Sequence, residues 1–194
     1  MNYSRLVVPG ISQEDCAALA RTGKYKQYCR SVDDLLNGRC PFCTPDPEVN
    51  AVQFENNHWW AWPNIANPEK NTARHFLIVP KRHVLDIRDL SLTEFASMGT
   101  IIEDVLDGLE IDSCGLLIRN GDATLSAGTI RHLHLHIMVP DGTGRVESPF
   151  FKGSESEAES NARAIVYEKL RTGTATIYSL TDAEKALVAG GRLL

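Results

Sequence analysis

Short apolar runs separated by polar turns fill the middle of the chain, and their composition is typical of strands. Asn56 and Asn57, between the first two runs, favour a hairpin. The third run is almost continuously apolar, which is typical of a central strand that is buried on both faces. The predicted strands are residues 51–55, 58–62, 75–80, 114–119 and 129–140.

Helical patterns surround these strands. Ser91 and Glu94 form a capping box that opens a long helix ending near Leu109, and the apolar residues of this helix fall on one stripe. Ser12 and Asp15 form a similar pattern before the first of four shorter helices. The shorter helices are predicted over residues 13–22, 24–37, 155–171 and 181–189.

Several strands with one long helix among them favour an α+β fold with a mostly antiparallel sheet. We expect the helices to pack on one face of this sheet and to leave the other face, which bears histidines, open. The chain is long enough for one sizeable core with extensions at both ends. The expected parts are a helical N-terminal extension (residues 1–38), a central domain (residues 39–140) and a C-terminal helical extension packed on the same domain (residues 141–194).

Composition and charge narrow the class of protein. Of the 194 residues, 43% are hydrophobic and 23% are charged, as in ordinary globular proteins. A formal charge of -5 provides no overall basic field to hold long nucleic acid. The N-terminus lacks the pattern of a signal peptide, and no apolar run approaches the length of a membrane span. The sequence thus predicts a cytoplasmic protein that binds neither long nucleic acid nor membranes.

Three of the six histidines, His132, His134 and His136, occupy alternate positions in the last predicted strand. Successive side chains of a strand point to opposite faces, so these three imidazoles are expected to share one face. Such a set can bind a metal, hold a phosphate, or present one histidine as a nucleophile beside two donors. We assign structural roles to His58 and His75.

The cysteine spacing indicates half of a metal site. Cys40 and Cys43 are separated by two residues, which lets two thiolates grip one zinc ion from a tight turn. Pro45 and Pro47 follow them and prevent the helix that a thioredoxin-like redox pair requires. An odd total of five argues against a disulfide framework. The remaining cysteines are typical core residues: Cys16, Cys29 and Cys114.

Residues 74–84, the helix that follows them and residues 132–138 together resemble the histidine triad (HIT) family of nucleotide hydrolases and transferases. The resemblance extends over residues 39–140 and includes the Cys-x-x-Cys pair. It implies that the central domain is a HIT-like catalytic domain. It also implies that the middle histidine, His134, attacks the α-phosphate of a small nucleotide substrate and forms a covalent nucleotidyl-histidine.

The resemblance also implies which residues surround the nucleotide. His136 and Thr129 are expected to donate hydrogen bonds to the developing phosphate charge. Asn120 matches, in approximate position, a family residue that binds the phosphate or the sugar. Asn64 or Asn67 matches the polar residue that contacts the ribose. The nearby tryptophans either offer a stacking surface or belong to the core: Trp59, Trp60 and Trp62.

Zinc-bearing members of the family bind the metal through the Cys-x-x-Cys pair, the histidine of a Pro-Lys-x-His segment and the first triad histidine. In this sequence those positions are Cys40, Cys43, His83 and His132. Four such ligands close the coordination shell, so the Zn²⁺ would be structural. Family members are commonly homodimers, and the apolar stripe of the long helix is available either for that contact or for the core.

One departure from the family pattern concerns the substrate. Gly128 precedes Thr129, where many members that cleave dinucleotides carry Gln. The sequence is therefore closer to the branch with diadenosine tetraphosphate phosphorylases, although Asp141 and Gly142 replace the Arg-Trp often found there. The expected substrate is adenylylated, such as a dinucleoside polyphosphate or a nucleoside phosphoramidate. Two alternatives are a hydrolase whose three histidines hold a catalytic zinc and a nucleotide-binding module with little turnover.

Overall fold

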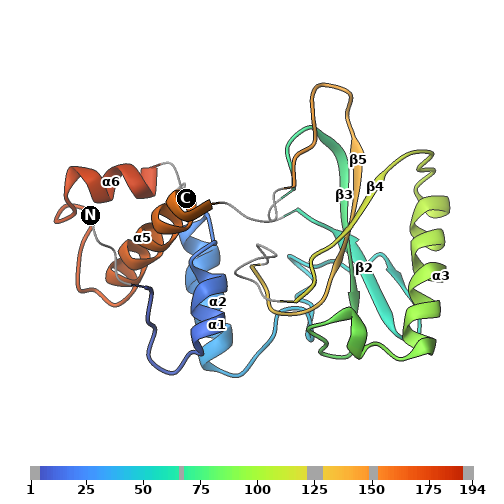
Figure 1. Cartoon of the computed structure of the whole chain (residues 1–194), viewed down its shortest axis with the longest axis horizontal. Helices are drawn as coiled ribbons and strands as arrows, with labels where there is room; N and C mark the ends of the chain where they lie inside the picture. Colours follow the sequence, from blue (N-terminus) through green and yellow to red (C-terminus); the bar gives the residue numbers. More distant parts are fainter. Residues whose placement is uncertain (1–4, 66–67, 122–128, 149–152, 190–194) are drawn as a thin grey trace. The chain divides into compact units, whose positions relative to one another are not determined.

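The computed structural model describes residues 5–65, 68–121, 129–148 and 153–189 (Figure 1). The chain forms two compact units. One comprises Met1–Arg39, Asp122–Arg131 and Phe150–Leu194, and the other comprises Cys40–Gly121 and His132–Pro149. The expected division of the chain after residues 38 and 140, with the C-terminal extension packed on the central domain, stays a prediction.

The first unit is helical and has its own apolar core. Its helices are α1 (Gln13–Leu19), α2 (Tyr25–Leu36), α5 (Gly153–Arg171) and α6 (Asp182–Ala189). All four are predicted from the sequence, and Ser12 caps α1 by accepting a hydrogen bond from the Asp15 backbone N–H. The core includes the buried side chains of Tyr28, Val32 and Tyr167. None of the helices in the described part of the chain is long and apolar enough to cross a membrane.

The second unit is built on a five-stranded antiparallel sheet with the strand order β1-β2-β3-β5-β4. The strands are β1 (Phe54–Glu55), β2 (Trp59–Pro63), β3 (Thr72–Pro80), β4 (Gly115–Ile118) and β5 (Leu135–Pro140). β1 and β2 form the predicted hairpin, in which Asn56 Oδ1 accepts hydrogen bonds from two backbone N–H groups. β3 is central, as its apolar run predicts, because it pairs with both β2 and β5. The α+β fold class is confirmed.

One face of the sheet packs against α3 (Leu92–Gly108) (Figure 1). The helix begins at the predicted capping box of Ser91 and Glu94. Its buried stripe packs on alternate residues of the strands, so the stripe belongs to the core of this unit. The opposite face therefore carries the other set of alternating side chains. The core under α3 includes Trp59, Ala61, Phe76, Ile78, Leu135 and Ile137.

Two predicted strands are wrong in their extent. The strand predicted over residues 51–55 comprises only Phe54–Glu55. The sequence predicts a strand over residues 129–140, but the ladder begins only at Leu135. His132 and His134 therefore precede β5, and His136 lies within it. Of the three histidines, only His136 is thus part of the paired strand.

The cause is hydrogen bonding outside the ladder. The Leu133 backbone N–H donates to the Val84 carbonyl oxygen at 2.6 Å. The His132 ring is hydrogen-bonded to the Pro80 carbonyl oxygen at 2.9 Å. These bonds connect the segment before β5 to the end of β3 and the turn that follows it. The His132 side chain and the Leu133 N–H thus bond outside the sheet, in place of regular strand pairing.

Candidate active site and metal centre

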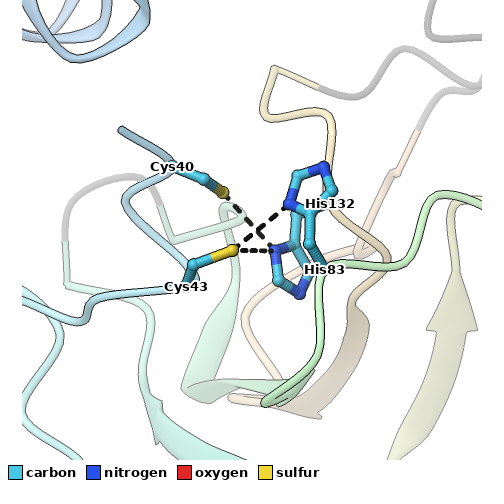
Figure 2. Close-up of side chains that lie close together, drawn as sticks. All are labelled: Cys40, Cys43, His83 and His132. Atoms are coloured by element: carbon cyan, nitrogen blue, oxygen red, sulfur yellow. Dashed lines mark hydrogen bonds between the residues drawn. The ribbon is translucent and has the colours of Figure 1, made fainter. Parts of the chain in front are cut away.

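Four potential metal ligands from three separate segments meet in the sheet unit (Figure 2). Cys40 and Cys43 precede β1, His83 follows β3, and His132 precedes β5. One ligand atom of each lies within 4.8 Å of the others. The fold thus brings together the metal set implied by the family resemblance, although 92 positions separate Cys40 from His132.

The hydrogen bonds of His132 decide which of its ring nitrogens faces the cysteines. Nε2 lies 2.9 Å from the Pro80 carbonyl oxygen, which can only accept, so Nε2 carries the proton. Nδ1 then presents a lone pair 3.4 Å from Cys40 Sγ and 3.5 Å from Cys43 Sγ. Burial lowers the pKa of His132 to about 4, so the ring is neutral at pH 7. A neutral imidazole held in this way is the form that binds zinc.

The complete donor set fits zinc. Cys43 Sγ lies 3.2 Å from His83 Nδ1, so two sulfur atoms and two ring nitrogens are grouped together (Figure 2). Two thiolates and two imidazoles are a common ligand set of tetrahedral zinc sites in proteins. This cluster can therefore hold a metal ion.

The hydrogen bond of His134 leaves one ring nitrogen with a lone pair. Nδ1 donates to the His132 carbonyl oxygen at 2.7 Å, so the proton lies on Nδ1 and the lone pair on Nε2. Burial lowers the pKa of His134, which favours the neutral ring. A neutral imidazole with an unprotonated Nε2 is the form in which histidine acts as a nucleophile.

A chain of hydrogen bonds determines the proton position of His136. The Glu69 backbone N–H donates to His75 Nδ1 at 2.9 Å, so neutral His75 carries its proton on Nε2. His75 Nε2 then donates to His136 Nδ1 at 2.8 Å, which leaves the proton of neutral His136 on Nε2. In the described part of the chain, this buried Nε2 has no hydrogen-bond partner. The N–H group of His136 Nε2 is therefore available to donate a hydrogen bond to a ligand.

Aromatic rings pack beside this histidine pair. The ring centroids of His134 and His136 are 4.9 Å apart. Phe42, which lies between the two cysteines in sequence, packs edge-on at 5.3 Å from His134 and at 5.4 Å from Trp62. Trp62 is fully buried, whereas Trp59 belongs to the core under α3. The site thus combines polar imidazoles with an apolar wall, which is typical of small-molecule sites.

The other predicted nucleotide-binding residues occupy different places. The Asn64 side-chain amide nitrogen lies 3.5 Å from both ring nitrogens of His75, so Asn64 adjoins the histidine chain. Asn120 Oδ1 accepts from the Ile87 backbone N–H at 2.6 Å and ties the end of β4 to the segment after β3. Thr129 is grouped with the helical unit, so its place at the nucleotide stays a prediction. Two positions used in the sequence analysis lie outside the described residues: Asn67 and Gly128.

Sequence reasoning missed three residues that the structure brings to this site. The structural role assigned to His75 omits its hydrogen bond to His136. Phe42 and Arg119 belong to no recognisable functional motif, so nothing in the sequence identifies them as site residues. The position of His75 on a strand next to the triad segment could have identified it, but only with knowledge of which strands pair and in which register.

The sheet unit should lose stability in mild acid because its buried histidines resist protonation. Burial is the main cause that lowers the pKa of His75 to about 4 and that of His136 to about 2, whereas an unfolded histidine titrates near its ordinary value of 6.5. Below pH 6.5 the unfolded state binds protons that the folded state does not. Each histidine should therefore contribute about 2 kcal/mol less stability at pH 5 than at pH 7.

Urea unfolding followed by tryptophan fluorescence measures this effect, since all three tryptophans lie in β2. The His75→Gln variant serves as the control, and its stability should change less between pH 7 and pH 5 than that of the parent. Equal changes in the two proteins would exclude His75 as a source of the pH dependence.

Comparison with known proteins gives one family match and several similar structures. The family model described as "Scavenger mRNA decapping enzyme C-term binding" matches residues 39–148. A HIT family hydrolase from Legionella pneumophila Philadelphia 1 is 24% identical, covering 57% of this chain and 98% of that chain, with a TM-score of 0.42. A zinc-bound histidine triad family protein from Mycobacterium smegmatis is 22% identical, covering 70% and 94%, with a TM-score of 0.43. A HIT family protein from Bacillus anthracis is 23% identical, covering 71% and 97%, with a TM-score of 0.43.

The family match spans more than half of the 194 residues. It contains all four potential metal ligands, the three triad histidines and the five strands of the sheet. The sequence match and the arrangement of these side chains agree, and the chain belongs to the histidine triad family, in the group whose model describes the C-terminal domain of scavenger mRNA decapping enzymes.

Proposed function

We propose that this protein is a nucleotidyl hydrolase or transferase that cleaves its substrate at the α-phosphate through a covalent intermediate on His134. The proposal rests on the proton positions of two neighbouring rings, with a lone pair on His134 Nε2 and an N–H donor on His136 Nε2. With ring centroids 4.9 Å apart, the two rings are close enough for one phosphate group to contact both.

In the first step, His134 Nε2 attacks the α-phosphorus and the bond from phosphorus to the leaving group breaks. The leaving group departs with the electron pair, and the nucleotidyl group is held by a P–N bond. In the second step, water or phosphate attacks the same phosphorus and loses a proton to solvent. The P–N bond then breaks and neutral His134 is regenerated, so that two easier displacements replace one difficult reaction.

Neighbouring groups stabilise the charges that develop in these steps. The N–H of His136 donates to a phosphate oxygen, and the Thr129 hydroxyl adds a second donor in this proposal. The His132 carbonyl oxygen, which accepts from His134 Nδ1, stabilises the positive charge on the ring after the attack. Each group acts at a different atom of the reacting phosphate or the nucleophile.

Cys40, Cys43, His83 and His132 would hold a structural Zn²⁺ in this proposal. When bound, zinc supplies a cross-link between segments that are remote in sequence, and its four protein ligands leave no open position for substrate. His132 connects this site to the nucleophile, because its ring faces the cysteines and its carbonyl oxygen holds His134 Nδ1. The metal ligands thereby orient the attacking ring.

The remaining site residues suit a small nucleotide. The Phe42 ring, backed by the buried Trp62, forms an apolar wall behind the imidazoles. Asn64 adjoins the histidine chain and offers an amide to the ribose, and Asn120 is assigned to the edge of the phosphate. The substrate in this proposal is adenylylated, and it is either a dinucleoside polyphosphate or a nucleoside phosphoramidate.

A catalytic zinc held by the three triad histidines is less compatible with the hydrogen bonds. Nδ1 of His132 faces the cysteines, Nδ1 of His134 donates to a carbonyl oxygen, and Nδ1 of His136 accepts from His75. The three rings therefore have separate partners and do not converge on one point. A nucleotide-binding module without turnover would use the same contacts. The trapping experiment below distinguishes it from an enzyme.

We also infer that the protein forms a homodimer through the edge of the sheet at β4. In the described part of the chain this strand pairs only with β5, which leaves its other edge without a neighbour. Leu116 on β4 is 51% exposed, and an exposed edge strand with an apolar side chain is a template for pairing with a second chain.

Trapping the covalent intermediate tests the proposed function. The protein is mixed with a slowly turned-over adenylylated substrate, quenched at alkaline pH to preserve the P–N bond, and digested for mass spectrometry. One adenylyl group is expected on the peptide that contains His134, and none on the His134→Asn variant. Turnover without any adduct would favour direct attack by water, and binding without turnover would favour the binding module.

A further inference from the structure

Arg119 places a buried positive charge on the histidine-bearing face of the sheet. Leu116 and Ile118 of β4 pair with residues of β5 that pack under α3, so the alternating positions, including Arg119 one residue beyond the strand, belong to the opposite face. The Arg119 side chain is only 8% exposed. Neither the family motif nor the reaction proposed above assigns a role to this residue.

Hydrogen bonds and an ion pair connect Arg119 to the histidine chain. Its guanidinium donates to Ser148 Oγ at 2.8 Å and lies 3.8 Å from Glu69 Oε1. Glu69 is the residue whose backbone N–H donates to His75 Nδ1, and His75 in turn donates to His136. Two residues, Glu69 and His75, therefore connect Arg119 to His136, which would hold the α-phosphate.

The charge balance of the site indicates why a cation at this position matters. Burial is the main cause that lowers the pKa values of His75 and His136, and the positive charge of Arg119 adds to it, so Arg119 lies within electrostatic reach of both rings. Neutral imidazoles can donate hydrogen bonds to a phosphate, but they contribute no net charge. Arg119 carries a positive charge, which the Glu69 carboxylate balances at 3.8 Å in this structure, and the planar donor set of a guanidinium suits phosphate oxygens.

We propose that Arg119 binds the phosphate chain of the substrate beyond the α-phosphate, and that it makes the enzyme prefer polyphosphate substrates over those with a single phosphate. This inference rests on the proposed function, because it takes the α-phosphate to lie at His134 and His136. It favours a dinucleoside polyphosphate over a nucleoside phosphoramidate, since the latter has no second phosphate to contact Arg119.

Nucleotide affinities test the inference without interference from turnover. AMP, ADP and ATP are titrated by calorimetry, without added magnesium, into the His134→Gly protein and into the same protein with Arg119→Met. In the first protein, affinity should rise from AMP to ATP by about tenfold or more, the effect of a charged hydrogen bond. Arg119→Met should remove that gain and change AMP binding by no more than about twofold, because AMP has no second phosphate for Arg119 to contact.

Two further variants separate binding from structure. Arg145→Met is the matched control, because Arg145 also lies 3.8 Å from a glutamate but its side chain is 86% exposed, and it should leave all three affinities unchanged. Arg119→Lys keeps the charge and loses the bidentate geometry, so it should retain part of the gain for ATP. If the methionine variant fails to fold, the affinities of the lysine variant test the inference in its place.

The possible failures are distinguishable. Equal losses for AMP and ATP, or no loss for either, in folded Arg119 variants would overturn this inference and leave the proposed function intact. Absence of AMP, ADP and ATP binding to the His134→Gly protein would count against the proposed function itself, and this inference would fall with it.

Discussion

Replacement of His134 by Gly should remove nearly all turnover, with a loss on the order of a thousandfold or more for a covalent nucleophile. The reason is that His134 Nε2 bears the lone pair proposed to attack phosphorus. The ring is not among the predicted metal ligands, so metal content should survive. Steady-state release of AMP from an adenylylated substrate measures the loss.

Three readouts on the same variant make this test decisive. Zinc content and melting temperature should stay close to those of the parent, and added imidazole should restore part of the activity by filling the space left by the side chain. His58→Asn is the matched control, since His58 lies outside the site, and it should remain active. Loss of metal from the His134→Gly protein would favour the catalytic-zinc alternative, and full activity would refute the nucleophile.

Replacement of both Cys40 and Cys43 by Ser should abolish metal binding and lower stability together. The purified parent is expected to carry about one zinc per chain. Zinc binding contributes about 10 kcal/mol or more in small domains that depend on it, and a unit with its own apolar core should lose a part of that amount. Elemental analysis and thermal unfolding measure the two effects.

The control for the double variant is Cys29→Ser, which removes a thiol of the helical unit and should retain its zinc. Full retention of zinc by the double variant would disprove the assigned ligands. A loss of zinc with unchanged stability would show that the metal is bound but does not cross-link the segments around His83 and His132.

Local sequence patterns were sufficient for most of the fold. Ser91 and Glu94 predict the start of α3, because a capping box satisfies backbone donors that the helix itself leaves unpaired. Asn56 predicts the hairpin of β1 and β2 for a similar local reason. The extent of β5 could not be predicted in this way, since the bonds that delay its start reach Pro80 and Val84, which are remote in sequence.

The four ligands of the metal cluster could be predicted in part from motif spacing and in part from the family resemblance. The spacing of Cys40 and Cys43 indicates half of a site, and the resemblance adds His83 and His132. The structure brings all four within reach of one ion. Their use as zinc ligands is the part that the double cysteine variant tests.

By itself, the sequence determined the elements and the reactive groups of this protein: its helices and strands, its α+β class, its membership of the family and the identity of the central histidines. Those properties depend on local periodicity, capping and short motifs, each of which involves only residues that are close in sequence. Only the tertiary structure decided the protonation pattern of the rings and the place of Arg119. Both depend on partners such as Glu69, which adjoin them because two strands pair in one register, and such pairing between remote segments is not encoded in any local pattern.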